Sequence, residues 1–217
     1  SELSTVEISE SIGKVSVLTI LPQDLKAVVI LAHGAGAGMT HRFMEDLAAN
    51  LAEFSIATIR YNFPYMEKRS RRPDVPAVAE KTVGALVRYS EEKFQNTPLL
   101  LSGKSFGGRM SSQYVSKHGP ATVKGIVFYG FPLHPPGKAD TQRAEHLKSI
   151  GIPLLFLQGT NDALATMSLI EETCSKLPNA TLVKFEGADH SFKIKKENAV
   201  QALAVETNRW IDIILKQ

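Results

Sequence analysis

Continuous apolar runs alternate along this chain with segments in which apolar residues recur every three or four positions. Residues 27–32 and 56–61 form runs typical of strands that are buried on both faces. Residues 44–51 between them have helical spacing, and Thr40 is placed to cap that helix. Further strands are predicted over 98–101, 125–129, 153–158 and 182–185, and further helices over 78–89, 106–114, 144–147, 165–177 and 200–214. This order predicts an α/β protein with a doubly wound, mostly parallel sheet.

The first twenty residues follow a different pattern, in which apolar and polar residues alternate. Val6 and Ile8 precede the polar turn at residues 10–13, and Val15 and Val17 follow it. This alternation predicts an antiparallel hairpin at one edge of the sheet. The chain contains no repeat, low-complexity tract or linker, so we expect a single domain over residues 1–217.

A sharp strand-to-helix transition is predicted around Ser105. The apolar run at 98–101 leads directly into Gly103-Lys104-Ser105-Phe106-Gly107, and helical spacing begins at once beyond it. A serine in such a turn is held on a strained backbone with its hydroxyl exposed, and small residues two positions away let strand and helix pack closely. The pattern is that of a nucleophile elbow.

Two nucleotide-binding interpretations of the glycine-rich segments fail on spacing. A P-loop ending at Gly103-Lys104-Ser105 would need a glycine at residue 98, which is Pro98. In the other cluster, Gly34-Ala35-Gly36-Ala37-Gly38-Met39, the last glycine of a dinucleotide fingerprint is replaced by Met39. Neither segment predicts a nucleotide site.

Three residue types suited to acyl transfer follow the ends of predicted parallel strands. Ser105, Asp162 and His190 occur in that order, which is the order of an α/β-hydrolase triad. His190 would accept and return the serine proton, while Asp162 would fix the imidazole tautomer. Asp189, next to the histidine, is an alternative acid, and Asp162 could instead only cap the following helix.

The oxyanion formed by attack of Ser105 needs two backbone donors. The N–H of Phe106, directly after the serine, is one candidate, and the N–H of Ala35 in the loop after the 27–32 strand is the other. His33 precedes this loop, so we expect it to be structural. His41, His118, His134 and His146 are expected at the surface, and their scatter indicates no metal site.

Composition narrows the partners and the compartment. The 217 residues include 43% hydrophobic and 22% charged residues, with a net charge of +3. These values are typical of a soluble globular protein and do not favour a nucleic-acid or membrane partner. The single Cys174 excludes an intramolecular disulfide, and no signal pattern or membrane-length apolar run is present. We expect a cytoplasmic protein without a cofactor.

The segments 33–38, 60–64, 103–109, 159–162 and 189–192 together resemble the α/β-hydrolases of the dienelactone-hydrolase-like kind. Within them, the chain is similar to the group that includes subunit three of the nonspecific-lethal acetyltransferase complex and a testis-expressed relative. The resemblance implies an α/β-hydrolase fold with Ser105, Asp162 and His190 as the triad. Dienelactone hydrolases proper use a cysteine nucleophile, so serine at position 105 argues against their substrate.

We therefore expect a serine hydrolase that cleaves a small carboxylic ester or thioester through an acyl-enzyme on Ser105. The short segment between Gly130 and about Asp140 leaves no room for a cap domain, which predicts an open site. Arg71 and Arg72 could bind a substrate carboxylate. The alternative is a non-catalytic interaction module that uses the basic run Lys68–Arg72 to bind an acidic partner.

Overall fold

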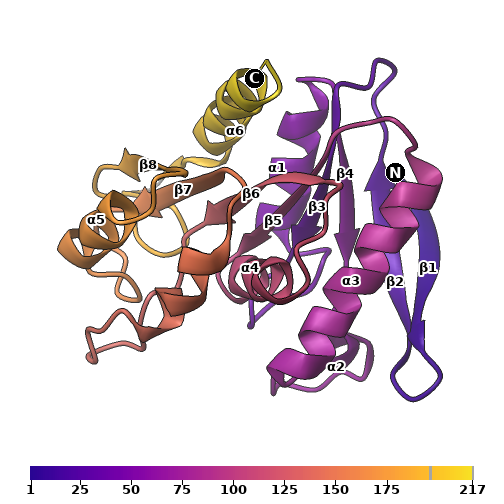
Figure 1. Ribbon diagram of the computed structural model, residues 1–217, viewed down its shortest axis with the longest axis horizontal. Coiled ribbons are helices and arrows are strands. Elements are labelled where there is room, and N and C mark those ends of the chain that lie inside the picture. Colours follow the sequence, from indigo (N-terminus) through magenta and orange to yellow (C-terminus); the bar gives the residue numbers. More distant parts are fainter. Residues whose placement is uncertain (196, 217) are drawn as a thin grey trace.

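One mixed sheet organises the protein, as seen in a computed structural model that describes residues 1–195 and 197–216 (Figure 1). The strand order is β1-β2-β4-β3-β5-β6-β7-β8. Pairing is antiparallel between β1 and β2 and between β2 and β4, and parallel from β4 to β8. The predicted doubly wound α/β fold with an antiparallel N-terminal hairpin is confirmed.

The bounds of the elements agree closely with the apolar pattern of the sequence. The strands of the sheet are β1 (Glu2–Ser9), β2 (Gly13–Ile20), β3 (Ala27–Ala32), β4 (Ile56–Tyr61), β5 (Leu99–Lys104), β6 (Val123–Tyr129), β7 (Leu154–Gly159) and β8 (Ala180–Phe185). The helices are α1 (Arg42–Ala52), α2 (Pro64–Glu67), α3 (Pro76–Lys93), α4 (Phe106–His118), the 3₁₀ helix η1 (Gln142–Ser149), α5 (Met167–Ser175) and α6 (Val200–Ile214). A small hairpin of β9 (Lys193–Ile194) and β10 (Glu197–Asn198) and the single-turn helix α2 were not predicted.

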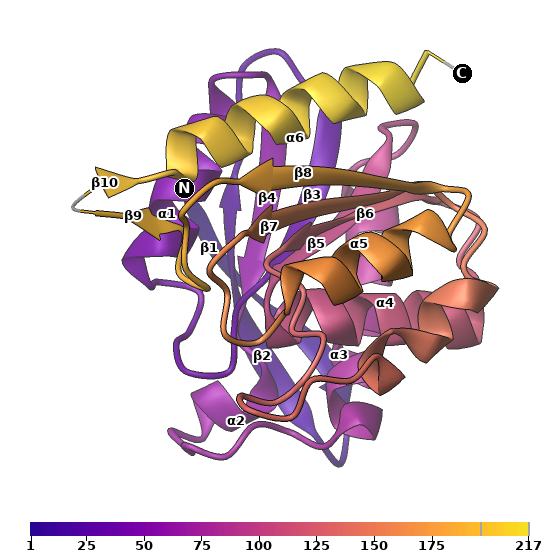
Figure 2. The same ribbon diagram turned by 90° about the vertical axis from the view of Figure 1, so that its left-hand side faces the viewer.

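Strand β3 is apolar throughout because it contributes to two hydrophobic layers. In β3, Val28, Ile30 and Ala32 belong to one core cluster, and the alternate residues Ala27, Val29 and Leu31 belong to the other. Helices α1 and α6 cover one layer, whereas α3, α4, η1 and α5 cover the other (Figure 2). Successive side chains of a strand point to opposite faces, so a strand with helices on both sides is predominantly apolar on both of them.

Two local predictions are wrong. The residue that caps α1 is His41, not Thr40: its imidazole Nδ1 accepts the backbone N–H of Phe43 at 3.2 Å. His134 is buried rather than at the surface, and its Nε2 accepts the backbone N–H of Thr166 at 2.9 Å. A histidine nitrogen can replace the usual hydroxyl or carboxylate acceptor in both places.

The segment between β6 and β7 bears directly on access to the strand ends. It consists of the loop 130–141 and the single helix η1, so the described residues include no inserted cap here. Within the same described residues, no helix has the length and apolar character needed to cross a membrane.

Candidate active site

Ser105 is the single residue between strand β5 and helix α4, and its backbone is in an uncommon conformation. Its φ and ψ angles are 50° and −115°, outside the backbone regions that residues other than glycine normally adopt. The backbone N–H of Ser105 donates to the carbonyl oxygen of Tyr129 at 3.2 Å, which ties the turn to the neighbouring strand β6. The geometry matches the strained elbow expected from the sequence.

Three glycines around this turn allow the strand and the helix to touch. A Cβ atom on Gly103 would lie 2.2 Å from the backbone nitrogen of Gly108. A Cβ on Gly107 would lie 2.6 Å from the carbonyl oxygens of Ala32 and His33, at the end of β3. Because backbone atoms occupy these positions, no larger residue fits without moving α4 away from the sheet.

The structure brings together Ser105, which follows β5, Asp162, which follows β7, and His190, which follows β8. The Nε2 atom of His190 lies 2.8 Å from the Ser105 Oγ, and its Nδ1 atom lies 2.6 Å from the Asp162 Oδ2. The imidazole is one-quarter exposed, whereas the Asp162 side chain is buried. The Asp162 carboxylate can accept only from a protonated Nδ1, so it leaves Nε2 free to take the serine proton.

Asp162 is held by two further donors, one of which the sequence analysis missed. The Nε2 group of Gln158 donates to Asp162 Oδ2 at 2.7 Å, and the backbone N–H of Leu164 donates to Oδ1 at 2.8 Å. Gln158 is buried, and its Oε1 accepts the N–H of Phe131 at 2.9 Å. An amide in an otherwise apolar strand, four residues before the candidate acid, was the available signal.

The alternative acid, Asp189, has a different position. Its Oδ1 accepts the backbone N–H groups of Ser191 at 2.8 Å and Lys193 at 3.0 Å, so the carboxylate closes the turn that carries His190. Of the two aspartates, Asp162 makes the imidazole contact and Asp189 makes backbone contacts. The same turn contains Phe192 with a positive φ of 59°.

The predicted oxyanion donors lie beside the serine. A Cβ on Gly34 would lie 3.9 Å from the Ser105 Cβ, so the loop that follows β3 borders Ser105. Among the described residues, the backbone N–H groups of Ala35 and Phe106 donate to no protein acceptor. Ala35 is exposed and Phe106 is half-buried, and their role as oxyanion donors stays a prediction.

His33 and Tyr65 of α2 form hydrogen bonds with the loop that follows β3, in agreement with the structural role expected for His33. The backbone N–H of Phe63 donates to His33 Nε2 at 3.0 Å, so the ring proton is on Nδ1, which donates to the Gly34 carbonyl at 2.7 Å. Burial lowers the pKa of His33 to about 4. The Tyr65 hydroxyl donates to the Ala35 carbonyl at 2.9 Å, and burial raises its pKa to about 12.

Lys104, the residue before the serine, is a second group that the sequence analysis did not single out. Its Nζ donates to the backbone carbonyl of His190 at 2.5 Å and lies 5.5 Å from the centre of the Phe192 ring. Burial lowers the pKa of this ammonium group to about 8, although the charges of Asp162 and Asp189 oppose that effect. A buried cation therefore lies directly beside the triad.

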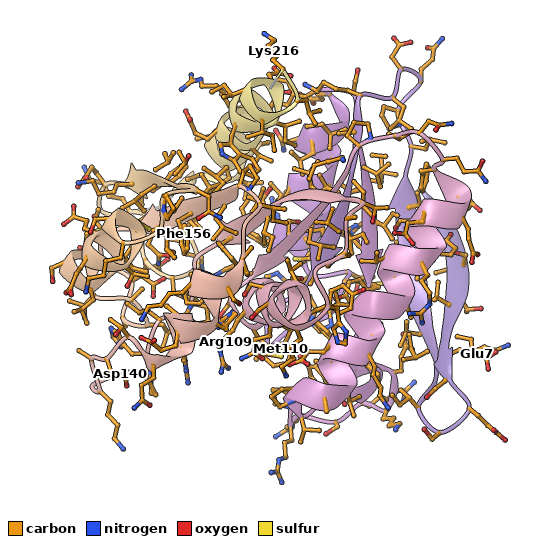
Figure 3. The ribbon with its side chains drawn as sticks, in the orientation of Figure 1. Glu7, Arg109, Met110, Asp140, Phe156 and Lys216 are labelled. Carbon is orange, nitrogen blue, oxygen red and sulfur yellow. The ribbon has the colours of Figure 1, made fainter. Side chains whose placement is uncertain are left out.

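The arginines proposed to bind substrate lie on an exposed loop. Arg71 and Arg72 follow α2, and within the described chain neither guanidinium makes a hydrogen bond or an ion pair. Their role in substrate binding stays a prediction. Arg109, one turn after Ser105, lies on the side of α4 toward η1 (Figure 3), where burial and the nearby charge of Arg143 lower its pKa.

The described residues also line a hollow that is not at this site. It measures about 320 Å³ and lies at the amino ends of β3 and β5, where Val28, Phe94 and Pro98 contribute to its lining. The triad lies at the opposite, carboxyl ends of the strands, where ligands of parallel α/β sheets bind. The part of the chain that the structure describes contains no cluster of side chains that could hold a metal ion.

Comparison with known proteins agrees with this geometry. The sequence profile of an alpha/beta hydrolase domain family matches residues 25–213, and the chain belongs to that family. A dienelactone hydrolase from Anabaena variabilis is 21% identical, with a TM-score of 0.78 over 98% of this chain and 97% of that one. An alpha-beta serine hydrolase homologue from Coxiella burnetii is 20% identical, with a TM-score of 0.75 over 97% and 95% of the two chains. A Xanthomonas campestris protein described as an a/b serine hydrolase without lid is 18% identical, with a TM-score of 0.72 over 100% and 94%.

The close contact at the elbow leads to a stability prediction. Gly103→Ala should lower the free energy of unfolding by about 3 kcal/mol, because the new methyl group meets backbone that cannot rotate away. Gly151→Ala is the matched control, since Gly151 is exposed, has no positive φ, and a Cβ placed on it would meet nothing within 4 Å. Chemical denaturation of both variants measures the difference, and equal stabilities would contradict the packing described.

Proposed function

We propose that this protein is a serine hydrolase that cleaves small carboxylic esters or thioesters through an acyl-enzyme on Ser105. The observation that carries the proposal is the hydrogen-bonded chain from Ser105 through His190 to Asp162, with distances of 2.8 and 2.6 Å. Membership of the α/β-hydrolase family supports it. Two of the similar structures are described as serine hydrolases, and a third is described as a cold-adapted esterase from an Arctic intertidal metagenomic library.

The proposed reaction uses only groups of this chain and water. As the Ser105 Oγ attacks the carbonyl carbon, its proton passes to His190 Nε2, and the carbonyl oxygen becomes an oxyanion. The N–H groups of Ala35 and Phe106 stabilise that charge. Collapse of the intermediate breaks the bond to the leaving alkoxide or thiolate, which takes the proton from His190. Water then attacks the acyl-enzyme with the same base, releases the acid and restores the serine.

The size of the substrate is suggested by the segment between β6 and β7. The loop 130–141 and η1 do not cover Ser105 as a cap domain would, which supports short soluble substrates. The similarity to the group containing subunit three of the nonspecific-lethal acetyltransferase complex stays a prediction from sequence motifs and supplies no substrate.

The alternative function is a non-catalytic interaction module. All five residues of the basic run Lys68–Arg72 are exposed, and this is the observation that favours it. Such a module would not need a serine, an imidazole and a carboxylate in mutual contact. Covalent labelling of Ser105 separates the two possibilities, because a module without turnover has no activated nucleophile.

Replacement of Ser105 tests the nucleophile. Ser105→Ala should reduce hydrolysis of activated short-chain esters by at least about 10⁴-fold and abolish labelling by a fluorophosphonate. The melting temperature should be nearly unchanged, since one half-exposed hydroxyl is lost. A variant that keeps more than a tenth of the parental rate would contradict the assignment.

Asp162 and Asp189, the two candidate acids near His190, provide a matched pair of variants. Asp162→Asn should lower kcat by about 10⁴-fold, because an amide at this position no longer fixes the tautomer of His190. Asp189→Asn should keep kcat within about tenfold, since its amide oxygen can still accept the two backbone N–H groups. The reverse ranking in steady-state kinetics would assign the acid to Asp189.

The proposed role of Arg71 and Arg72 in substrate binding can be tested by comparing charged and neutral substrates. If Arg71 and Arg72 bind the substrate, esters that carry a carboxylate should be hydrolysed faster than matched neutral esters, and Arg71→Ala and Arg72→Ala should reduce that ratio. Arg109→Gln serves as the comparison, because it removes a guanidinium one turn from Ser105. If only Arg109→Gln alters the ratio of the two hydrolysis rates, the anion-binding residue lies on α4. If none of the three variants alters this ratio, the proposal that an arginine binds the substrate carboxylate is refuted.

A further inference from the structure

Lys104 and Ser105 contact the same histidine from two sides. The Ser105 Oγ lies 2.8 Å from His190 Nε2, while the Lys104 Nζ donates to the His190 carbonyl oxygen at 2.5 Å. The two groups come from adjacent positions at the end of β5, whereas His190 follows β8, which is separated from β5 in the sheet by β6 and β7. Lys104 therefore makes a direct contact between two distant parts of the site.

The surroundings of Lys104 are unusual for a cation. Alternation along β5 places its side chain on the same face as Leu100, in the layer covered by α1 and α6. Its ammonium group lies over the ring of Phe192, which is fully buried. An apolar side chain could fill this position without the desolvation that a buried charge requires, so packing alone does not account for a lysine here.

The turn that Lys104 contacts needs external support. It contains Phe192 with a φ of 59°, a conformation that costs energy for a residue other than glycine. Asp189 closes the turn from within through the N–H groups of Ser191 and Lys193. Of the contacts described above, only those of Lys104 connect the backbone of this turn to the strand that carries the nucleophile.

We propose that Lys104 is a positioning residue for His190: its ammonium group fixes the turn that carries the imidazole against the end of β5. This inference rests on the proposed hydrolase function. A second effect is electrostatic, because the carboxylates of Asp162 and Asp189 lie close enough to act on the ammonium. The cation attracts the two carboxylates.

Gly130 completes the arrangement. It has a φ of 74°, and a Cβ there would lie 3.2 Å from the Lys104 Nζ and 3.5 Å from the His190 ring. The ammonium and the imidazole therefore meet beside the first residue after β6. The positive φ is a conformation that favours glycine at this position.

Lys104→Met tests the proposal, because methionine keeps the length and apolar bulk of the side chain and removes the charge. We expect kcat for a short-chain ester to fall about tenfold or more with KM nearly unchanged. Lys193→Met is the matched control: it removes an exposed lysine from the strand after the same turn and should leave kcat and KM unchanged. A folded Lys104→Met with kcat within twofold of the parent across pH 6 to 9.5 would overturn the proposal.

The pH profile separates positioning from packing. Burial lowers the pKa of Lys104 to about 8, so raising the pH through this value removes the positive charge beside His190. The parent and Lys193→Met should lose activity with a midpoint near pH 8, and Lys104→Met should lack this alkaline limb.

Nuclear magnetic resonance of the His190 ring gives a readout that does not require turnover. In the parent protein, the ring resonances should show an inflection near pH 8 that is absent in Lys104→Met. If Lys104→Met does not fold, the parent titration still decides, and the absence of that inflection overturns the proposal. An inflection in a protein without esterase activity would instead refute the hydrolase function and leave the contact between Lys104 and His190 established.

Discussion

The turn from β5 into α4 brings the end of a strand and the first turn of a helix into van der Waals contact, and only hydrogen atoms fit between them. A Cβ on Gly103 or Gly107 would lie within 2.6 Å of backbone atoms of α4 or β3. This contact forces the whole change of direction onto Ser105, whose φ of 50° projects the hydroxyl from the sheet edge. It also places the first free N–H of α4 beside the loop that follows β3. The candidate nucleophile Ser105 and the candidate oxyanion donors therefore share one steric origin.

The residues around this turn are held by two separate sets of contacts. On the side of β3 and β4, His33 bridges Phe63 and Gly34, and the Tyr65 hydroxyl bonds to Ala35, so buried aromatic groups shape the oxyanion loop. On the side of β7 and β8, Gln158 and Lys104 hold Asp162 and the His190 turn. Both sets use polar groups with little access to water, where a hydrogen bond is strong and an unpaired group is costly. The side chains that hold the site in place are thus different from Ser105, His190 and Asp162.

Much of the fold could be predicted because the strands of a doubly wound sheet are apolar on both faces. Residues 27–32 and 56–61 were located without error for this reason, and Ser105, Asp162 and His190 stood out because each follows a strand. Other features depend on contacts that no local pattern records. The position of β4 between β2 and β3, and the bond from Lys104 to a carbonyl 86 residues later, are of this kind. The cap of α1 was misassigned because His41, an uncommon capping residue, has the required extended backbone.

The neutral state of His33 limits the acidity that the folded protein can tolerate. The unfolded chain takes up a proton on this imidazole near its ordinary pKa of 6.5, whereas in the folded protein the buried ring has a pKa of about 4. Its contribution to stability is therefore complete above pH 6.5 and is lost as the pH falls from 6.5 toward 4, by about 3 kcal/mol in total. A proton on Nε2 would also remove the acceptor for the Phe63 N–H and push apart the ends of β3 and β4. The loop that carries Ala35 begins at His33, so acid should disorder this loop, which lies beside Ser105.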